Sequence, residues 1–183
     1  MKNQLRIIGG DFKRRVLPFA DVDGLRPTPD RVRETLFNWL MWNVQNAQVL
    51  DLCAGSGALS FEALSRGAGH VTMIEPSTKQ AQYLKDNLQL LKIQNSKLIV
   101  STAQAAVRHL PENNFDLVFL DPPYSLSLWQ ELAGLVDPLI KNEGFIYVEA
   151  DCPLDQLVLP TSWRLSKETK AGAVRAGLYQ KNV

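Results

Sequence analysis

The chain has 183 residues, of which 45% are hydrophobic and 21% are charged, and its formal net charge is +1. These values are typical of one ordinary soluble globular domain. No apolar run approaches the roughly 20 residues of a membrane helix, and the N-terminal MKNQLRIIGG lacks a signal-peptide core, so we expect a cytoplasmic protein without membrane contact. Two cysteines and two histidines in no metal-ligating spacing predict reduced thiols and no metal site.

The charge is unevenly distributed along the chain. Residues 1–40 contain eight Lys/Arg and five Asp/Glu, and residues 163–183 contain five and one, so the ends carry +3 and +4. Residues 41–162 contain seven and thirteen, which gives −6. Basic ends around an acidic centre suit contact with a polyanion. Ordinary solvated lysines and arginines are the alternative interpretation.

The elements alternate along most of the chain. LRIIGG and RRVLPF flank DFK and predict a short hairpin, and PDRVRETLFNWLMW predicts a helix. From residue 47 onward, we expect strands at 47–52, 70–75, 97–101, 115–120 and 143–149, and helices at 57–67, 77–92, 103–110 and 126–140. SWRLSKETK and AVRAGLYQ predict a terminal hairpin.

This alternation predicts an α/β fold, with a mostly parallel doubly wound sheet and an antiparallel hairpin at its end. Residues 1–45 are expected to form a hairpin and helix extension packed on one main domain at 46–183, which is a single folding unit. Parallel doubly wound sheets bind ligands beyond the carboxyl ends of their strands. Candidate site residues are therefore sought at those ends.

A glycine loop follows the first of the parallel strands. In VLDLCAGSGALSFEALSRGA, Asp51 ends the strand, and Gly55 and Gly57 form the turn before a helix. Glu75 ends the next strand, twenty residues after Gly55, where an acid can accept hydrogen bonds from ribose hydroxyls. A dinucleotide and S-adenosylmethionine both fit this pattern, and so does a structural glycine turn without a ligand.

The details favour S-adenosylmethionine as the cofactor. The loop is Gly-x-Gly-x-x-Ser, so Ser60 stands where a dinucleotide fingerprint has its third glycine. Asp51 directly precedes the loop and suits a ligand that carries a charged amine and no pyrophosphate. A small nicotinamide-dependent oxidoreductase is therefore the less favoured alternative.

A second motif, VFLDPPY, ends the strand at 115–120. The prolines stiffen the turn and remove two N–H groups, so Asp121, Pro122 and Tyr124 form a rigid corner rich in acceptors. Asp121 and the Pro122 carbonyl can each accept one N–H of an exocyclic amine, aiming its nitrogen at an electrophilic methyl. Tyr124 is expected to stack on the base. A rigid surface turn is the alternative.

These motifs bear a family resemblance. RIIGG, GLRPTPDRVRETLFNWL, DLCAGSGALSFEALSRGA and DPPY together resemble RsmD, the bacterial 16S rRNA guanine-N2-methyltransferase family, over nearly the whole chain. The resemblance implies a Rossmann-like S-adenosylmethionine-dependent fold. It also implies methyl transfer to the N2 amine of one guanine, in assembled or nearly assembled 30S subunits.

Residue roles carried over from the resemblance extend both motifs. Asp51, Gly55 and Gly57 would face the methionine part of the cofactor, and Glu75 its ribose. Thr28 is expected beside the cofactor. Ala103 and Gln104 stand where many relatives have an Asp or Asn before an alanine, so Gln104 or the backbone is expected at the adenine. The expected RNA-binding residues are Arg26 and, on the N-terminal hairpin, Arg6, Lys13, Arg14 and Arg15.

Two rivals remain at this point. A DNA adenine or cytosine amino-methyltransferase shares the corner chemistry, although the chain has no room for an added target-recognition region. A non-catalytic ribosome-assembly factor would bind cofactor and RNA without turnover. We expect a monomer without an obligate protein partner.

Overall fold

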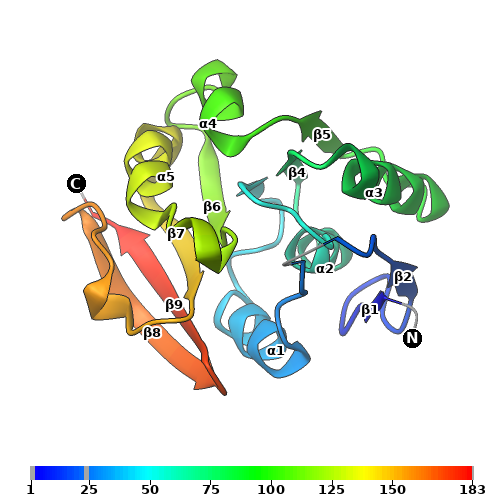
Figure 1. Cartoon of the computed structure of the whole chain (residues 1–183), viewed down its shortest axis with the longest axis horizontal. Coiled ribbons are helices and arrows are strands. Elements are labelled where there is room, and N and C mark those ends of the chain that lie inside the picture. The colour runs from blue at the N-terminus through cyan, green and yellow to red at the C-terminus, as the bar shows by residue number, and fades with distance from the viewer. Residues whose placement is uncertain (1–2, 23–24, 183) are drawn as a thin grey trace.

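Within the residues that the computed structural model describes, 3–22 and 25–182, the core is a seven-stranded sheet in the order β5-β4-β3-β6-β7-β9-β8 (Figure 1). The first five strands in this order are parallel, and β9 is antiparallel to both β7 and β8. The predicted α/β fold with an antiparallel terminal hairpin is confirmed. The strands are β3 (Gln48–Asp51), β4 (His70–Glu75), β5 (Ser96–Val100), β6 (Phe115–Leu120), β7 (Ile140–Ala150), β8 (Trp163–Ala171) and β9 (Val174–Lys181).

Helices cover both faces of this sheet and create two hydrophobic cores. Along β6, Leu117 and Phe119 join one core, whereas Val118 and Leu120 join the other. Successive strand residues point to opposite faces, so a strand covered on both sides needs a continuous apolar run. The first core contains α1 (Asp30–Trp39), α2 (Ala58–Ser65) and α3 (Thr78–Leu90), and the second contains α4 (Ala103–Ala106) and α5 (Trp129–Val136).

The helix expected over residues 126–140 is shorter than predicted. It begins at Trp129, because Ser127 adopts a left-handed conformation with φ of 49° and interrupts the preceding turn. It ends at Val136, since Pro138 has no N–H with which to continue the helical hydrogen bonds. Short 3₁₀ turns occupy Val107–His109, Tyr124–Leu126, Asp137–Leu139 and Leu154–Gln156.

The N-terminal residues form the predicted hairpin and helix. Strands β1 (Gln4–Arg6) and β2 (Val16–Pro18) pair antiparallel, and the hairpin lies beside α2 and α3, far from β8 and β9 (Figure 1). Helix α1 packs on the sheet, where the Phe37 ring meets Phe119 edge-to-face with centroids 6.2 Å apart. One core thus joins α1 to the main sheet, and a domain boundary at residue 45 stays a prediction.

A buried carboxylate anchors the N-terminal hairpin. Glu62 on α2 is fully buried, and its two oxygens accept hydrogen bonds from the backbone N–H groups of Ile8 and Gly9, each 2.9 Å long. The guanidinium of Arg66 lies 2.8 Å from Glu62, and that of buried Arg33 lies 3.6 Å away. These bonds explain the presence of a charge inside the core, because each oxygen has partners.

The described residues contain no helix long and apolar enough to cross a membrane. In the same part of the chain, no group of three or more His, Cys, Asp or Glu side chains is placed to hold a metal ion.

Candidate active site

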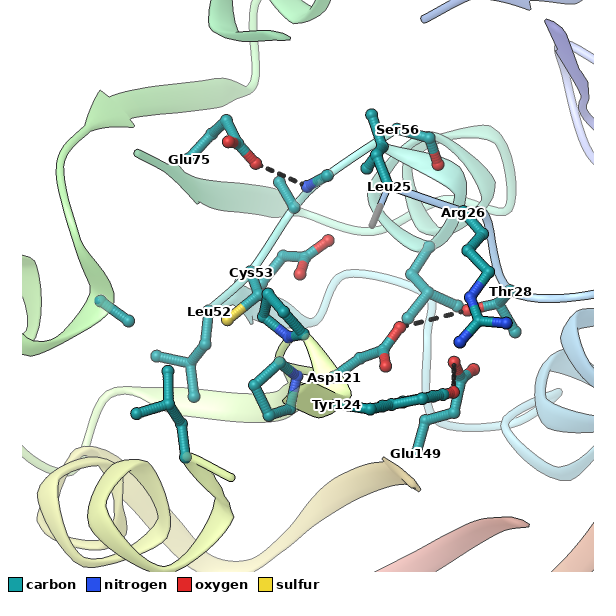
Figure 2. A pocket seen from close by; sticks show the side chains of 18 of the residues that line it. Leu25, Arg26, Thr28, Leu52, Cys53, Ser56, Glu75, Asp121, Tyr124 and Glu149 are labelled. Carbon is teal, nitrogen blue, oxygen red and sulfur yellow. Dashed lines mark hydrogen bonds between the residues drawn. The ribbon is translucent and has the colours of Figure 1, made fainter. Parts of the chain in front are cut away.

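A cavity of about 590 Å³ opens at the carboxyl ends of β3, β4, β6 and β7 (Figure 2). It joins the glycine loop to the Asp121 corner, although Asp121 comes 66 residues after Gly55 in the sequence. Acidic groups line it at the glycine loop and at the Asp121 corner, together with apolar side chains. The acidic lining residues are Asp51, Glu75, Asp121 and Glu149.

The glycine loop turns from β3 into α2. Gly55 (φ 56°) lines the cavity, and a Cβ there would lie 2.9 Å from the Leu25 side chain. Gly57 (φ 84°) lies behind the loop, outside the cavity lining that the structure describes. A Cβ on Gly57 would come within 2.6 Å of Phe61. Gly57 therefore shapes the loop through packing, whereas Gly55 faces the space that a ligand would fill.

Asp51 presents an unpaired oxygen in this loop. Its side chain is 1% exposed, and Oδ2 accepts a 2.7 Å hydrogen bond from the Ser60 hydroxyl. Oδ1 is buried without a hydrogen-bond partner. Burial raises the pKa of Asp51 to about 7, against the lowering effects of the Ser60 hydroxyl and the Cys53 backbone N–H. A buried carboxylate oxygen without a partner is unfavourable, so this atom fits a cationic ligand group.

Glu75 occupies the end of β4 on the other side of the loop. Its Oε1 accepts a hydrogen bond from the Gly55 N–H and its Oε2 one from the Ser77 N–H, each 2.9 Å long. Burial raises the pKa of Glu75, and the two backbone bonds oppose that rise. A carboxylate has about four lone-pair sites, so both oxygens keep capacity for ligand hydroxyls.

The Asp121 corner closes the opposite end of the cavity. The Thr28 hydroxyl lies 3.4 Å from Asp121 Oδ2 and donates to it. Burial raises the pKa of Asp121 well above its ordinary value, and the negative charge of nearby Glu149 adds to the rise. Pro122 and Pro123 line the same wall and supply no N–H. The wall therefore offers acceptors to a ligand.

The ring of Tyr124 is held by three neighbours. It stacks on buried Trp129 with centroids 5.9 Å apart, and the Arg26 guanidinium lies over it at 5.3 Å. Its hydroxyl donates a 2.8 Å hydrogen bond to Glu149. Burial is the largest cause that raises the pKa of Tyr124, so the hydroxyl keeps its proton at neutral pH. Of the neighbours of this ring, Arg26 is exposed (Figure 2).

Comparisons with known proteins agree on the family. The family described as "Conserved hypothetical protein 95" matches residues 5–180. The ribosomal RNA small subunit methyltransferase D of Escherichia coli is 44% identical over 97% of this chain and 90% of its own length. The protein of the same name from Haemophilus influenzae is 42% identical over 98% of this chain and 95% of its length.

This chain belongs to the RsmD family. A solved structure of a putative methyltransferase from Escherichia coli superimposes with a TM-score of 0.89 at 42% identity, covering 98% of this chain and 99% of that one. The Rossmann-like fold of S-adenosylmethionine-dependent methyltransferases, which the family resemblance implied, is thereby confirmed.

The structure brings most predicted site residues of this RsmD-family chain into one cavity. Thr28 lies at the Asp121 end of it, away from Glu75, and its hydroxyl is already directed at Asp121. Gln104 lines the cavity, and its amide nitrogen lies 3.5 Å from a Glu131 oxygen. The residues that line the cavity are Arg26, Thr28, Asp51, Gly55, Glu75, Gln104, Asp121, Pro122 and Tyr124.

The N-terminal hairpin carries the other predicted residues. Its basic side chains are exposed and lie outside the described cavity lining: Arg6, Lys13, Arg14 and Arg15. The hairpin sits on the α2 and α3 side of the molecule (Figure 1). An RNA that reached both the hairpin and the cavity would extend across this side of the RsmD-family fold.

Sequence reasoning missed Glu149. This residue is 4% exposed at the end of β7, lines the cavity, and accepts hydrogen bonds from two tyrosines. The run FIYVEA places an acid at the end of an apolar strand, as VFLD does for Asp121. The same criterion that selected Asp121 would have found it, because the carboxyl ends of parallel strands share one edge.

Proposed function

We propose that this protein transfers a methyl group from S-adenosylmethionine to the exocyclic N2 amine of a guanine in 16S rRNA of the small ribosomal subunit. One observation carries the proposal: a single cavity joins the glycine-loop carboxylates Asp51 and Glu75 to the acceptor corner at Asp121. The names of the relatives, ribosomal RNA small subunit methyltransferase D, support small-subunit rRNA as the acceptor.

The residues at the loop fit the cofactor. The unpaired Asp51 oxygen would take the methionine ammonium group, which supplies the missing partner for a buried carboxylate. Glu75 would accept from the ribose hydroxyls, and the absence of a Cβ at Gly55 would admit the ligand close to the backbone. Gln104 would meet the adenine from its place in the cavity lining.

The corner residues hold and orient the acceptor amine. When bound, S-adenosylmethionine supplies a methyl that the N2 lone pair takes from sulfur, so that a C–N bond forms, the C–S bond breaks and sulfur keeps the electron pair. Asp121 and the Pro122 carbonyl accept the two N–H bonds and aim the lone pair. The raised pKa of Asp121 suits it to receive the proton that the alkylated nitrogen sheds. Thr28 fixes the carboxylate orientation through its hydrogen bond.

Basic groups outside the corner would bind the RNA backbone. Arg26 is exposed at the cavity, so it would leave the Tyr124 ring for a phosphate as the base enters. Arg6, Lys13, Arg14 and Arg15 would contact phosphates farther along the RNA. The proposal includes a cytoplasmic monomer acting on an assembled or nearly assembled 30S subunit, since that particle is itself cytoplasmic.

The test uses labelled S-adenosylmethionine with under-methylated 30S particles, free 16S rRNA and duplex DNA as acceptors. We expect label in N2-methylguanine from the particles, identified by mass after digestion. Asp121→Ala should abolish transfer, whereas Asp86→Ala, an exposed aspartate on α3, should not. Label in DNA would contradict the proposed acceptor, and cofactor binding without transfer to any acceptor would contradict catalysis.

A further inference from the structure

Glu149 and Asp121 occupy equivalent positions on neighbouring strands. Leu120 of β6 pairs with Val148 of β7 in parallel register, so Asp121 and Glu149 each follow at the same level of the sheet. Their side chains therefore leave the sheet on the same face and gather beside Tyr124 (Figure 2). The register thus builds a pair of carboxyl groups at the cavity end where the acceptor base is proposed to bind.

Glu149 is held in place and keeps capacity for another donor. Oε2 accepts the Tyr124 hydroxyl at 2.8 Å, and Oε1 accepts the Tyr147 hydroxyl at 2.7 Å. The indole N–H of Trp129 donates to the Glu149 backbone carbonyl at 2.9 Å. Two of about four lone-pair sites on the carboxylate are thereby used, and a third meets the Asp121 carboxyl group, whose pKa this contact helps to raise. The remaining site belongs to a fixed acceptor on the cavity lining.

The acceptors of Asp121, Pro122 and Glu149 would match a nucleobase edge that carries neighbouring N–H donors. Guanine presents its N1–H beside the N2 amine, so three N–H bonds lie along one edge. Adenine and cytosine place a ring-nitrogen acceptor beside their exocyclic amine, and that lone pair would face a carboxylate. Thr28 has one side-chain donor, its hydroxyl, and this donor is already directed at Asp121. A site built to receive an N–H rejects an analogue without it, because its buried polar group is left unpaired.

We propose that Glu149 selects guanine by accepting its N1–H, while Asp121 and the Pro122 carbonyl hold the N2 amine. This inference rests on the proposed function and assigns base specificity to a residue outside the Asp-Pro-Pro-Tyr motif. Tyr147 and Trp129 act as its supports. Tyr124, which belongs to the motif, donates its hydroxyl to Glu149.

The test replaces the methylated guanine, once mapped, with 2-aminopurine. This base keeps the amine at C2 but has a bare acceptor at N1. Single-turnover methylation is measured on 30S particles reconstituted from splint-ligated 16S rRNA that carries either base. We expect the wild-type protein to methylate 2-aminopurine at least ~100-fold more slowly than guanine. Glu149→Gln should slow the methylation of guanine. It should also reduce the ratio of the guanine rate to the 2-aminopurine rate at least ~10-fold, because the amide can donate a hydrogen bond to the bare N1 of 2-aminopurine.

Tyr147→Phe is the matched control. It removes one hydrogen bond to Glu149 and leaves the carboxylate, so both rates should fall together and their ratio should stay within about twofold of wild type. Equal wild-type rates on the two bases would overturn the inference regardless of how the variants fold. An unchanged ratio in folded Glu149→Gln would also overturn it. No wild-type transfer to guanine would instead overturn the proposed function.

Discussion

Protonation of Asp51 is expected to control cofactor affinity. The side chain is buried, one of its oxygens lacks a partner, and its pKa is raised to about 7. A cationic ammonium placed beside this carboxylate favours the ionised form and lowers its pKa. Below about pH 7, binding must therefore release a proton, and the affinity should fall as the pH falls.

The size of the effect follows from the pKa of Asp51. With a value of about 7 in the free protein, about half of the molecules are ionised at pH 7 and roughly one in eleven at pH 6. If the bound state is ionised at both, the dissociation constant should rise roughly fivefold over that interval. Asp51→Asn removes the titration, so the variant should bind more weakly at pH 7 and lose the part of the pH dependence due to Asp51.

Isothermal titration calorimetry with S-adenosylhomocysteine provides the assay. This product retains the ammonium group, which stays charged over the interval. Buffers with different ionisation enthalpies report the number of protons released. The charge of Glu75 helps to raise the pKa of Asp51, so the two groups titrate together and a Glu75→Gln variant measures the share of the pH dependence due to Glu75. Equal pH slopes for wild type and Asp51→Asn, or no proton release at pH 6, would refute the reasoning.

The raised pKa of Asp51 also predicts that the protein without cofactor loses stability as the pH rises. The pKa of Asp51 is higher in the folded chain than the ordinary 3.8, so its contribution to stability is best at low pH and is lost as pH rises from about 4 to 7. A rise of about three pKa units corresponds to a loss of roughly 4 kcal/mol in the free energy of unfolding above pH 7. Asp51→Asn should therefore raise the free energy of unfolding at pH 8 more than at pH 5, measured by urea unfolding without cofactor.

Three further predictions concern packing and RNA binding. Glu62→Gln should lower the free energy of unfolding by roughly 3–5 kcal/mol, because it breaks a buried ion-pair network. Lys141→Gln breaks an exposed ion pair and should change the free energy of unfolding by less than about 1 kcal/mol. Urea unfolding measures both variants, and similar losses would contradict the role of burial. Gly57→Ala should lower the melting temperature more than Gly172→Ala, because both glycines have positive φ but only at Gly57 does a Cβ meet other atoms; equal shifts would mean that the clash is relieved. Arg26→Ala should reduce the slope of log affinity for 16S rRNA against log salt concentration by about one, and an unchanged slope would exclude a phosphate contact.

The order of elements was predictable because it depends on local patterns. A continuous apolar run, Leu117–Leu120, marked β6, and shorter apolar runs marked β3 and β4, since all three strands are buried on both faces. Acids at the ends of those strands indicated Asp51, Glu75 and Asp121, because parallel strands share one ligand-binding edge. The two ends of α5 were predicted less well, since its start depends on the turn around Ser127 and its end on Pro138.

Pairwise contacts across the cavity were decided by the tertiary structure alone. The Ser60 hydroxyl reaches Asp51, and Arg26 covers the Tyr124 ring that was predicted to be open to a base. Glu149 stands beside Asp121 because β6 and β7 pair in a register that equates Val148 with Leu120. Sequence periodicity determines which residues face the core or the strand ends, since that depends on neighbours a few residues away. Strand order and register determine which of those residues meet, and they depend on how the whole sheet packs.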